Sequence, residues 1–474
     1  MSFARILRSS ALMGGAQVAT LGVAFVRTKV IAQLMGPAGV GLAGVLTAFN
    51  GNVSTFAAWG LGASGVRLIS AAPEDEKAAK QAAVRRLGLT LSGLGLVASL
   101  LLFWPVAQLT FDSSRYALEL LIGGLAVPCM VASSIWASVL QAAGHVKSLA
   151  KAQALSALGG LCFGLPLIYF FGTIGIAVSL LFAAAVPMAF TWHVARRDGV
   201  MREAPARAED VRALFDMGVG LMAIGVASQL AAYCVRLLII KQHGDDVAAG
   251  LADAGYYQAA IAIAGSLPAL VFSAMATDFF PRVAAAKDEN EAKVLAEKQI
   301  EAALLLALPI FIGLITMSEL GIQLLYAEDF EPAGPLLDWM VWGVFVRLLG
   351  WPLGYWLVAR GSMRTVVLAE VISNLVMALL PLFLLPAFGL KGAAISYLVG
   401  FAVYAMVMLA VARRRCGAWL SRVTLARFFG AAFLLLAAQG FAAIVPGVYW
   451  GFLPTSLAAV GCFYAYRRAL SSEA

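Results

Sequence analysis

Long apolar segments separated by short polar loops follow one another along the whole chain, and this pattern predicts a polytopic membrane protein. Most segments have about the 20 apolar residues that a helix needs to cross a bilayer. The strands of an outer-membrane barrel would instead alternate over about ten residues. We therefore expect an all-α fold with fourteen transmembrane helices. The expected spans are residues 10–34, 40–70, 87–109, 118–143, 153–171, 173–194, 215–241, 253–281, 299–326, 334–359, 366–386, 392–412, 423–445 and 450–466.

The composition agrees with this interpretation and excludes several other classes of protein. Hydrophobic residues make up 62% of the chain and charged residues 13%, against about 45–50% and 25% in soluble domains. The net charge of +8 comes from Lys and Arg in short loops, so we expect no nucleic-acid partner. The histidines and cysteines have no metal-ligand spacing, and the chain has no P-loop motif, so we expect no metal and no cofactor.

The basic residues are distributed unevenly between alternate loops. The N-terminal tail, the even-numbered loops and the C-terminus hold 26 Lys and Arg, whereas the odd-numbered loops hold two, Arg115 and Lys391. Because an excess of Lys and Arg marks the cytoplasmic side, we expect both termini in the cytoplasm. The six basic residues left inside the expected spans are Arg27, Lys29, Arg67, Arg236, Lys241 and Arg347.

An internal repeat relates the two halves of the chain. Leu140–Lys147 corresponds to Leu357–Arg364 at an offset of 217, and Gly172, Gly175 and Ser179 correspond to Gly389, Gly392 and Ser396. Six spans followed by six in the same orientation form a parallel repeat with a shared cavity between the halves. We expect an N-terminal half at 1–198, a cytoplasmic linker at 199–214, a C-terminal half at 215–415 and two additional helices at 416–474.

Three arginines lie deep in the expected spans: Arg27, its repeat counterpart Arg236, and Arg347, which has no counterpart. An ionised side chain at membrane depth costs about 2.5–17 kcal/mol and therefore usually faces a water-filled cavity or a partner. We expect the three arginines to bind an anionic substrate there. The alternative is a structural ion pair with a buried carboxylate, and Asp278 and Glu370 are the candidates for that role or for ion coupling.

Other charged and aromatic residues are weaker candidates. Lys29 cannot face the cavity squarely together with Arg27, because residues two apart lie about 200° apart around a helix, and Lys241 ends its span, where it can reach water. Arg67 and Arg282 lie near the cytoplasmic face, where they either contact substrate or extend to lipid headgroups. Trp351 and Tyr355 either stack on sugars or anchor their helix at the membrane interface.

Two motifs carry a resemblance to a known family: Gly36–Gly41 after the first span, and Ala276–Val283, which closes the eighth. Both resemble the Wzx-type O-antigen and polysaccharide-repeat flippases of the multidrug/oligosaccharidyl-lipid/polysaccharide exporter superfamily. The resemblance implies a MATE-like pair of six-helix repeats around a central cavity. It also implies that an undecaprenyl-pyrophosphate-linked oligosaccharide is moved from the cytoplasmic to the periplasmic leaflet by alternating access.

Arginine suits this substrate, because its guanidinium matches the geometry of phosphate and stays ionised. No bond is made or broken, so we expect a transporter and not an enzyme. We expect a monomer in the bacterial inner membrane, in contact with membrane lipids and with polysaccharide polymerase and chain-length proteins as candidate partners. The alternatives are a cation-coupled multidrug exporter, a fourteen-span lipid II flippase and a non-transporting scaffold.

Overall fold

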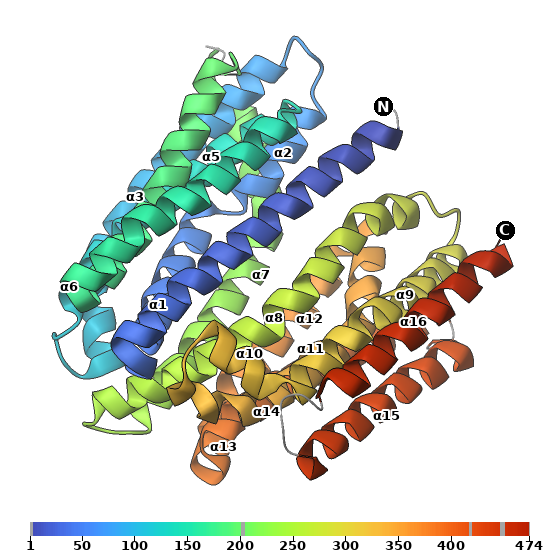
Figure 1. Cartoon of the computed structure of the whole chain (residues 1–474). Coiled ribbons are helices and arrows are strands. Elements are labelled where there is room, and N and C mark those ends of the chain that lie inside the picture. The colour runs from blue at the N-terminus through green and yellow to red at the C-terminus, as the bar shows by residue number, and fades with distance from the viewer. Residues whose placement is uncertain (1–2, 201–203, 417–419, 446–450, 474) are drawn as a thin grey trace. The chain divides into compact units, whose positions relative to one another are not determined.

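The structure is a computed structural model that describes residues 3–200, 204–416, 420–445 and 451–473 (Figure 1). Every regular element in these residues is a helix, so the predicted all-α class is confirmed. Within these described ranges, eleven helical segments are long and apolar enough to cross a membrane. The chain forms two compact units, Met1–Gly255 and Tyr256–Ala474, with the division inside α8.

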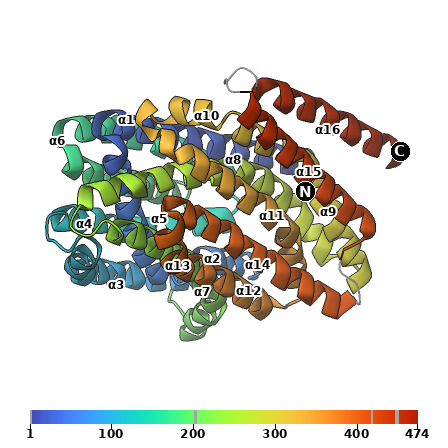
Figure 2. The same ribbon diagram turned by 90° about the horizontal axis from the view of Figure 1, so that it is seen from below.

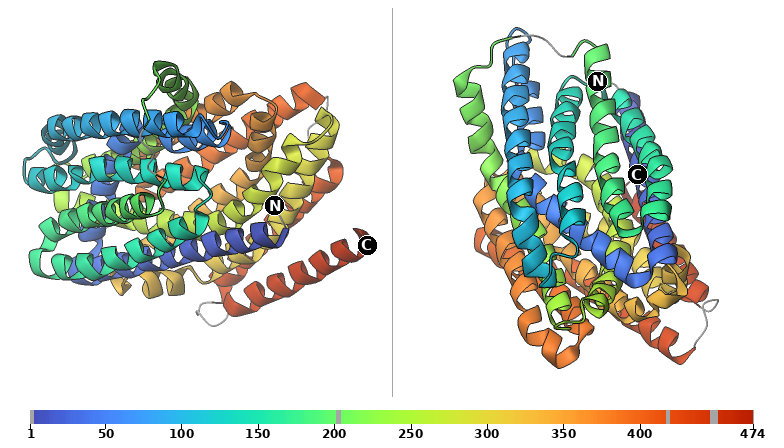
Figure 3. Two further views of the ribbon diagram at one scale, coloured as in Figure 1. Left: turned by 90° about the horizontal axis from the view of Figure 1, so that it is seen from above. Right: turned by 90° about the vertical axis from the view of Figure 1, so that its left-hand side faces the viewer.

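The first unit consists of seven helices and the start of an eighth, and its long helices run in a roughly common direction (Figure 3). Its helices are α1 (Phe3–Ala58), α2 (Leu61–Ser70), α3 (Lys77–Phe111), α4 (Ala117–Gly124), α5 (Ala126–Ala142), α6 (Val146–Arg197), α7 (Ala208–Lys241) and the beginning of α8 (Val247–Ala284).

Helix α1 is broken at Gly36, where φ is 63° and ψ is −164°. Glycine adopts this left-handed region without steric cost, and Pro37 then supplies no N–H to the preceding turn. The expected spans 10–34 and 40–70 therefore meet inside α1, which ends at Ala58, and the second span continues as α2.

The glycines that follow this break allow close helix packing. A Cβ atom at Gly41 would overlap the carbonyl oxygen of Leu251, and one at Gly255 would overlap that of Pro37. Backbones can approach this closely only where small residues meet. The Gly36–Gly41 motif therefore serves the crossing of α1 and α8 within the first unit.

The second unit contains the rest of α8 and the C-terminal helices. They are α9 (Glu289–Thr316), α10 (Ser318–Leu325), the 3-10 helix η1 (Glu328–Ala333), α11 (Gly334–Ala359), α12 (Met363–Leu379), α13 (Pro381–Phe388), α14 (Leu390–Cys416), α15 (Arg422–Ile444) and α16 (Phe452–Glu473).

Local backbone geometry recurs between the units at the sequence offset of 217. Gly144 and Gly361 have φ of 78° and 75°, and Gly172 and Gly389 have φ of 56° and 57°. The polar contacts that follow α5 and α11 recur as well. His145 Nδ1 lies 3.1 Å from Asp198 Oδ2, and at the corresponding positions Arg415 donates to Ser362 Oγ.

The last two helices both pack on α9, while α15 and α16 approach each other at few points (Figures 1 and 2). The ring of Phe428 on α15 also stacks on Phe345 of α11, with centroids 4.7 Å apart. The helices predicted outside the repeat are thus attached to the second unit through α9 and α11.

Candidate functional site

Arg27 lies on α1 in the first unit, before the break at Gly36. Its Nε atom is buried and has no hydrogen-bond partner among the described residues. A buried donor of a charged group without a partner costs free energy, so this guanidinium can gain stability from an added anion. Lys29, two residues on, already has an interaction of its own.

Arg236 lies on α7 and is 7% exposed. Its Nη1 donates to the carbonyl oxygen of Ala232, one turn earlier on the same helix, at 2.5 Å. Lys241, at the end of α7, forms an ion pair with Asp112 at the end of α3. Lys241 is therefore bound by protein and does not simply extend into water.

Arg347 lies on α11 in the second unit, and the structure supplies the ion pair that the sequence left open as an alternative. Its Nη2 is 3.9 Å from Glu370 Oε1 on α12. Its guanidinium carbon lies 4.8 Å from the centre of the Phe401 ring on α14. Arg347 thus links three helices through one charge pair and one cation–π contact.

Glycines on α11 do not leave open space beside Arg347. A Cβ atom at Gly350 would come within 2.8 Å of the Tyr404 ring, and one at Gly354 within 2.8 Å of the Tyr404 hydroxyl. Tyr404 of α14 fills the volume beside both glycines and is 4% exposed. The small residues therefore serve helix packing here.

Trp351 and Tyr355 belong to an aromatic cluster within the second unit. The Trp351 ring stacks on Phe272 with centroids 5.2 Å apart, and its centroid is also 5.2 Å from that of Tyr355. Tyr355 meets Phe280 edge to face at 6.0 Å. One face of Trp351 is thus covered by protein, so a sugar could stack only on the other face.

Two of the other expected residues are exposed. Arg67, in the last turn of α2, and Arg282, in the last turn of α8, are exposed, as expected for side chains that reach headgroups. Arg282 also has an interaction within the protein. The side chain of Asp278 lies outside the described residues.

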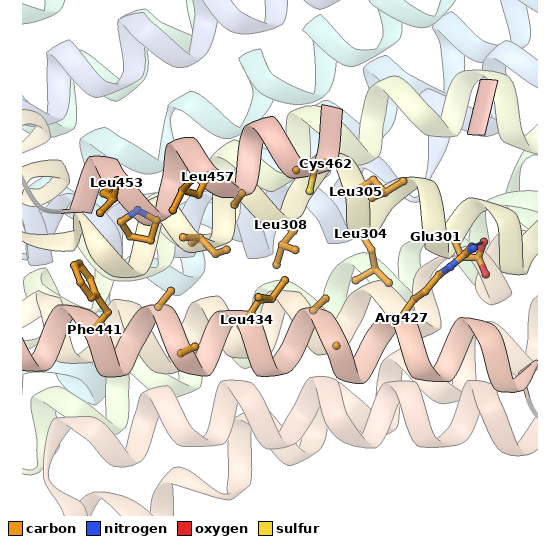
Figure 4. Close-up of a pocket in the computed structure, with 18 residues that line it drawn as sticks. Glu301, Leu304, Leu305, Leu308, Arg427, Leu434, Phe441, Leu453, Leu457 and Cys462 are labelled. Atoms are coloured by element: carbon orange, nitrogen blue, oxygen red, sulfur yellow. Dashed lines mark hydrogen bonds and ion pairs between the residues drawn. The ribbon is translucent and has the colours of Figure 1, made fainter. Parts of the chain in front are cut away.

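A long apolar groove of about 740 Å³ runs between α15 and α16 over α9. Among the described residues that line it, only Glu301 and Arg427 are charged, and both lie at one end (Figure 4). From Arg427 to Phe441 the helix rises about 21 Å, or two-thirds of the roughly 30 Å hydrocarbon thickness of a bilayer. This shape and lining suit one long hydrocarbon chain with an anionic end.

The sequence argument missed this groove, the buried carboxylate of Glu119 and the half-buried carboxylate of Asp338. Arg427 counts toward the cytoplasmic excess of basic residues, and nothing in a single helix shows that it lies beside Glu301. Glu119 is 5% exposed and accepts a 2.8 Å hydrogen bond from Thr173 Oγ1. Asp338 Oδ1 is buried without a hydrogen-bond partner among the described residues. Both carboxylates lie at the edges of apolar segments in the sequence, and this position was the sequence signal that could have identified them as candidates.

Comparison with known proteins identifies the family. Residues 30–335 match the family model described as "Polysaccharide biosynthesis protein". The chain belongs to this family. It is 22% identical over 304 residues to a Shigella flexneri protein named "Putative O-antigen transporter", and the match covers 62% of this chain and 69% of that protein.

Solved structures show the same fold. The chain resembles the lipid II flippase MurJ in an inward closed conformation with a TM-score of 0.75 and 14% identity, covering 97% of this chain and 99% of that one. It resembles an outward-facing MATE-family multidrug resistance transporter with a TM-score of 0.58 and 17% identity, covering 87% and 95%. The chain therefore shares the fold of these transporter structures, and it is a multi-pass membrane protein.

Proposed function

We propose that this protein is a flippase that moves an undecaprenyl-pyrophosphate-linked oligosaccharide from the cytoplasmic to the periplasmic leaflet for surface polysaccharide or O-antigen synthesis. The observation that carries the proposal is Arg27, a guanidinium inside an apolar candidate span whose buried Nε has no hydrogen-bond partner in the described part of the chain. A pyrophosphate supplies the missing acceptor and the missing negative charge. Family membership and the named O-antigen transporter support this choice of substrate.

The transport path rests on two six-helix parallel repeats and fourteen crossings. The break in α1 at Gly36 and the break in α6 at Gly172 would each separate one membrane crossing from the next. The matched backbone geometry of the glycines at offset 217 supports the repeat. The proposed halves are residues 1–198 and 215–415, joined by the linker 199–214, with the two additional crossings in 416–474. Both termini would lie in the cytoplasm and the chain would reside in the inner membrane.

The pyrophosphate would be held by Arg27, Arg236 and Arg347 while the halves alternate about it, assisted by Lys29 and by the more superficial Arg67, Lys241 and Arg282. The face of Trp351 that Phe272 does not cover, together with Tyr355, would contact the first sugars. Glu370 would neutralise Arg347 between transport events. The prenyl chain would remain in lipid and lie along the groove of α9, α15 and α16, whose apolar lining matches it. The protein would therefore work as a transporter without chemical conversion of its substrate.

The rival function is a cation-coupled multidrug exporter, and one observation favours it. Glu119 is a buried carboxylate within the first unit, and such exporters are expected to exchange protons or sodium on membrane-buried carboxylates. Glu119, however, has a protein donor in Thr173, whereas Arg27 Nε has none among the described residues.

Deletion of the protein from its host separates the two functions. The flippase predicts that lipid-linked repeat units accumulate in the inner leaflet and that surface polysaccharide is lost. Normal polysaccharide combined with drug hypersensitivity would contradict the proposal and favour the exporter. An unchanged phenotype after the three arginines are neutralised would indicate a scaffold, and accumulation of lipid II instead would indicate the lipid II flippase.

Single-cysteine labelling tests the proposed topology. Cysteines introduced at Ser113 and Asp245 should react with a membrane-impermeant reagent in intact cells, and cysteines at Ala78 and Ala204 should react only after lysis. Reaction at position 204 in intact cells would contradict the two-half arrangement.

A further inference from the structure

Helix α7 is bound to α3 at both of its ends within the first unit. At the first turn of α7, Asp210 Oδ1 accepts a 3.0 Å hydrogen bond from Lys80 Nζ of α3, and Asp210 is 5% exposed. Toward the other end, the hydroxyls of Tyr233 and Thr110 of α3 share a 2.6 Å hydrogen bond, and Lys241 adds the ion pair described above. Polar contacts with α3 therefore hold α7 near its start and near its end.

Between these points α7 lies against the second part of α1 at very short range. A Cβ atom at Gly225 would lie 2.6 Å from Thr55 Cγ2, and one at Gly51 would lie 2.0 Å from Gln229 Nε2. Asn52 Nδ2 donates to the carbonyl oxygen of Gln229 at 3.0 Å. Glycines on both helices permit this approach, so the two helices fit together as one packed pair.

The junction between α1 and α2 also depends on α7. Trp59 has a φ of 48° and Gly60 a φ of 66°, and a tryptophan in this region is strained and persists only where its surroundings hold it. Helix α7 supplies those surroundings: Trp59 Nε1 donates to the carbonyl oxygen of Phe215 at 3.2 Å. A Cβ atom at Gly218 would lie 2.1 Å from the Trp59 carbonyl oxygen. Separation of α7 from α1 would remove both contacts.

We propose that α7 moves with the first unit during transport, so that the boundary between the moving bodies lies within α8 and not in the linker 199–214. The internal repeat makes α7 the first helix of the C-terminal half, whereas the contacts divide the chain inside α8. When one body rocks against another, helices on either side of the boundary separate at one membrane face in each state. Helix α7 instead holds α1 and α3 along its length, which is the arrangement of helices that move together.

Helix α8 offers a place to bend just past this division. Pro268 lies inside α8 and removes one hydrogen bond from the helix, and a Cβ atom at Gly265 would meet no atom within 4 Å. The proposal rests on the proposed function in taking alternating access as given. It also has a consequence for the substrate: Arg27 and Arg236 would travel on one body and Arg347 on the other.

Disulfide locking of α7 tests the proposal in a full-length variant without the five native cysteines. The pair Thr55→Cys/Gly225→Cys joins α1 to α7, because the two Cβ atoms lie no more than about 4.1 Å apart, within the range of a disulfide. The oxidised protein in liposomes should flip a pyrophosphate-linked glycolipid at the same rate as its reduced form. Ala57→Cys/Gly95→Cys is the matched control, since it joins the same part of α1 to α3, where the Cβ positions are 3.0 Å apart. Loss of flipping on oxidation of the α1–α7 pair alone, with recovery on reduction, would overturn the proposal.

Spin-label distances in lipid nanodiscs give a second readout that needs no substrate and no disulfide. Labels on Arg86→Cys of α3 and Arg212→Cys of α7, both exposed positions, should show one distance population, whereas labels on Arg212→Cys and on Arg364→Cys of α12 should show more than one. One population for the α7–α12 pair together with several for the α3–α7 pair would contradict the proposal. The proposed function fails separately: if the reduced protein flips no glycolipid, the flippase is excluded, and the spin-label distances still decide which body carries α7.

Discussion

Replacing Arg347 separates a structural role from substrate binding. The Arg347→Ala variant leaves the Glu370 carboxylate, 17% exposed, without its cation. Stranding a fully buried charge costs about 3–5 kcal/mol, whereas exposed pairs contribute about 0.2–1 kcal/mol. Since the Arg347 side chain is 37% exposed and the pair is 3.9 Å apart, we expect a loss of about 1–3 kcal/mol in the free energy of unfolding.

The double variant Arg347→Ala/Glu370→Ala removes the stranded charge and should recover most of that loss. It should still lack the cation–π contact with Phe401, which is worth about 0.5–1 kcal/mol. If Arg347 also binds the pyrophosphate, transport should stay reduced by about tenfold or more in both variants.

Thermal unfolding of the purified variants, measured beside flipping of a pyrophosphate-linked glycolipid in liposomes, gives both quantities. Glu370→Ala alone is the control, because it keeps the cation and removes only its protein partner. Recovery of both stability and flipping in the double variant would refute a substrate role for Arg347. Wild-type stability in Arg347→Ala would refute the energetic argument for the pair.

Three further outcomes follow from the first unit. Arg27→Ala should reduce flipping by about tenfold or more with little change in melting temperature, because the buried Nε of Arg27 has no acceptor among the described residues to lose. A variant that melts at a clearly lower temperature would contradict this. Gly255→Ala should lower the free energy of unfolding by about 1–3 kcal/mol, because its methyl group would overlap the Pro37 carbonyl oxygen. Gly265→Ala on the same helix is the control: its methyl group meets no atom within 4 Å, so this variant should fold normally. Lys241→Ala should change the free energy of unfolding by no more than about 1 kcal/mol, as for a partly exposed ion pair. A larger loss, measured by chemical denaturation, would show that the contact between Lys241 and Asp112 organises the ends of α3 and α7.

Local properties of the chain determined most of the fold. Segment length and hydropathy were sufficient for the all-α class, because a lipid-exposed backbone must satisfy its hydrogen bonds within each helix, whereas eleven of the described helical segments, against fourteen expected spans, are long and apolar enough to cross a membrane. The glycines paired at the offset of 217, Gly144 with Gly361 and Gly172 with Gly389, have matching backbone geometry, since a glycine at a positive φ is a local requirement. The presence of Arg27, Arg236 and Arg347 within apolar segments was equally visible from the sequence.

Contacts between helices decided which partners the charged residues have. The sequence offered both Asp278 and Glu370 as partners, and packing of α11 against α12 joined Arg347 to Glu370. Arg427 and Glu301 lie 126 positions apart, and their meeting at the groove depends on α15 packing on α9. Hydropathy is a property of one segment, whereas pairing depends on which faces of two helices meet, so the groove and its charged end became visible only in the tertiary structure.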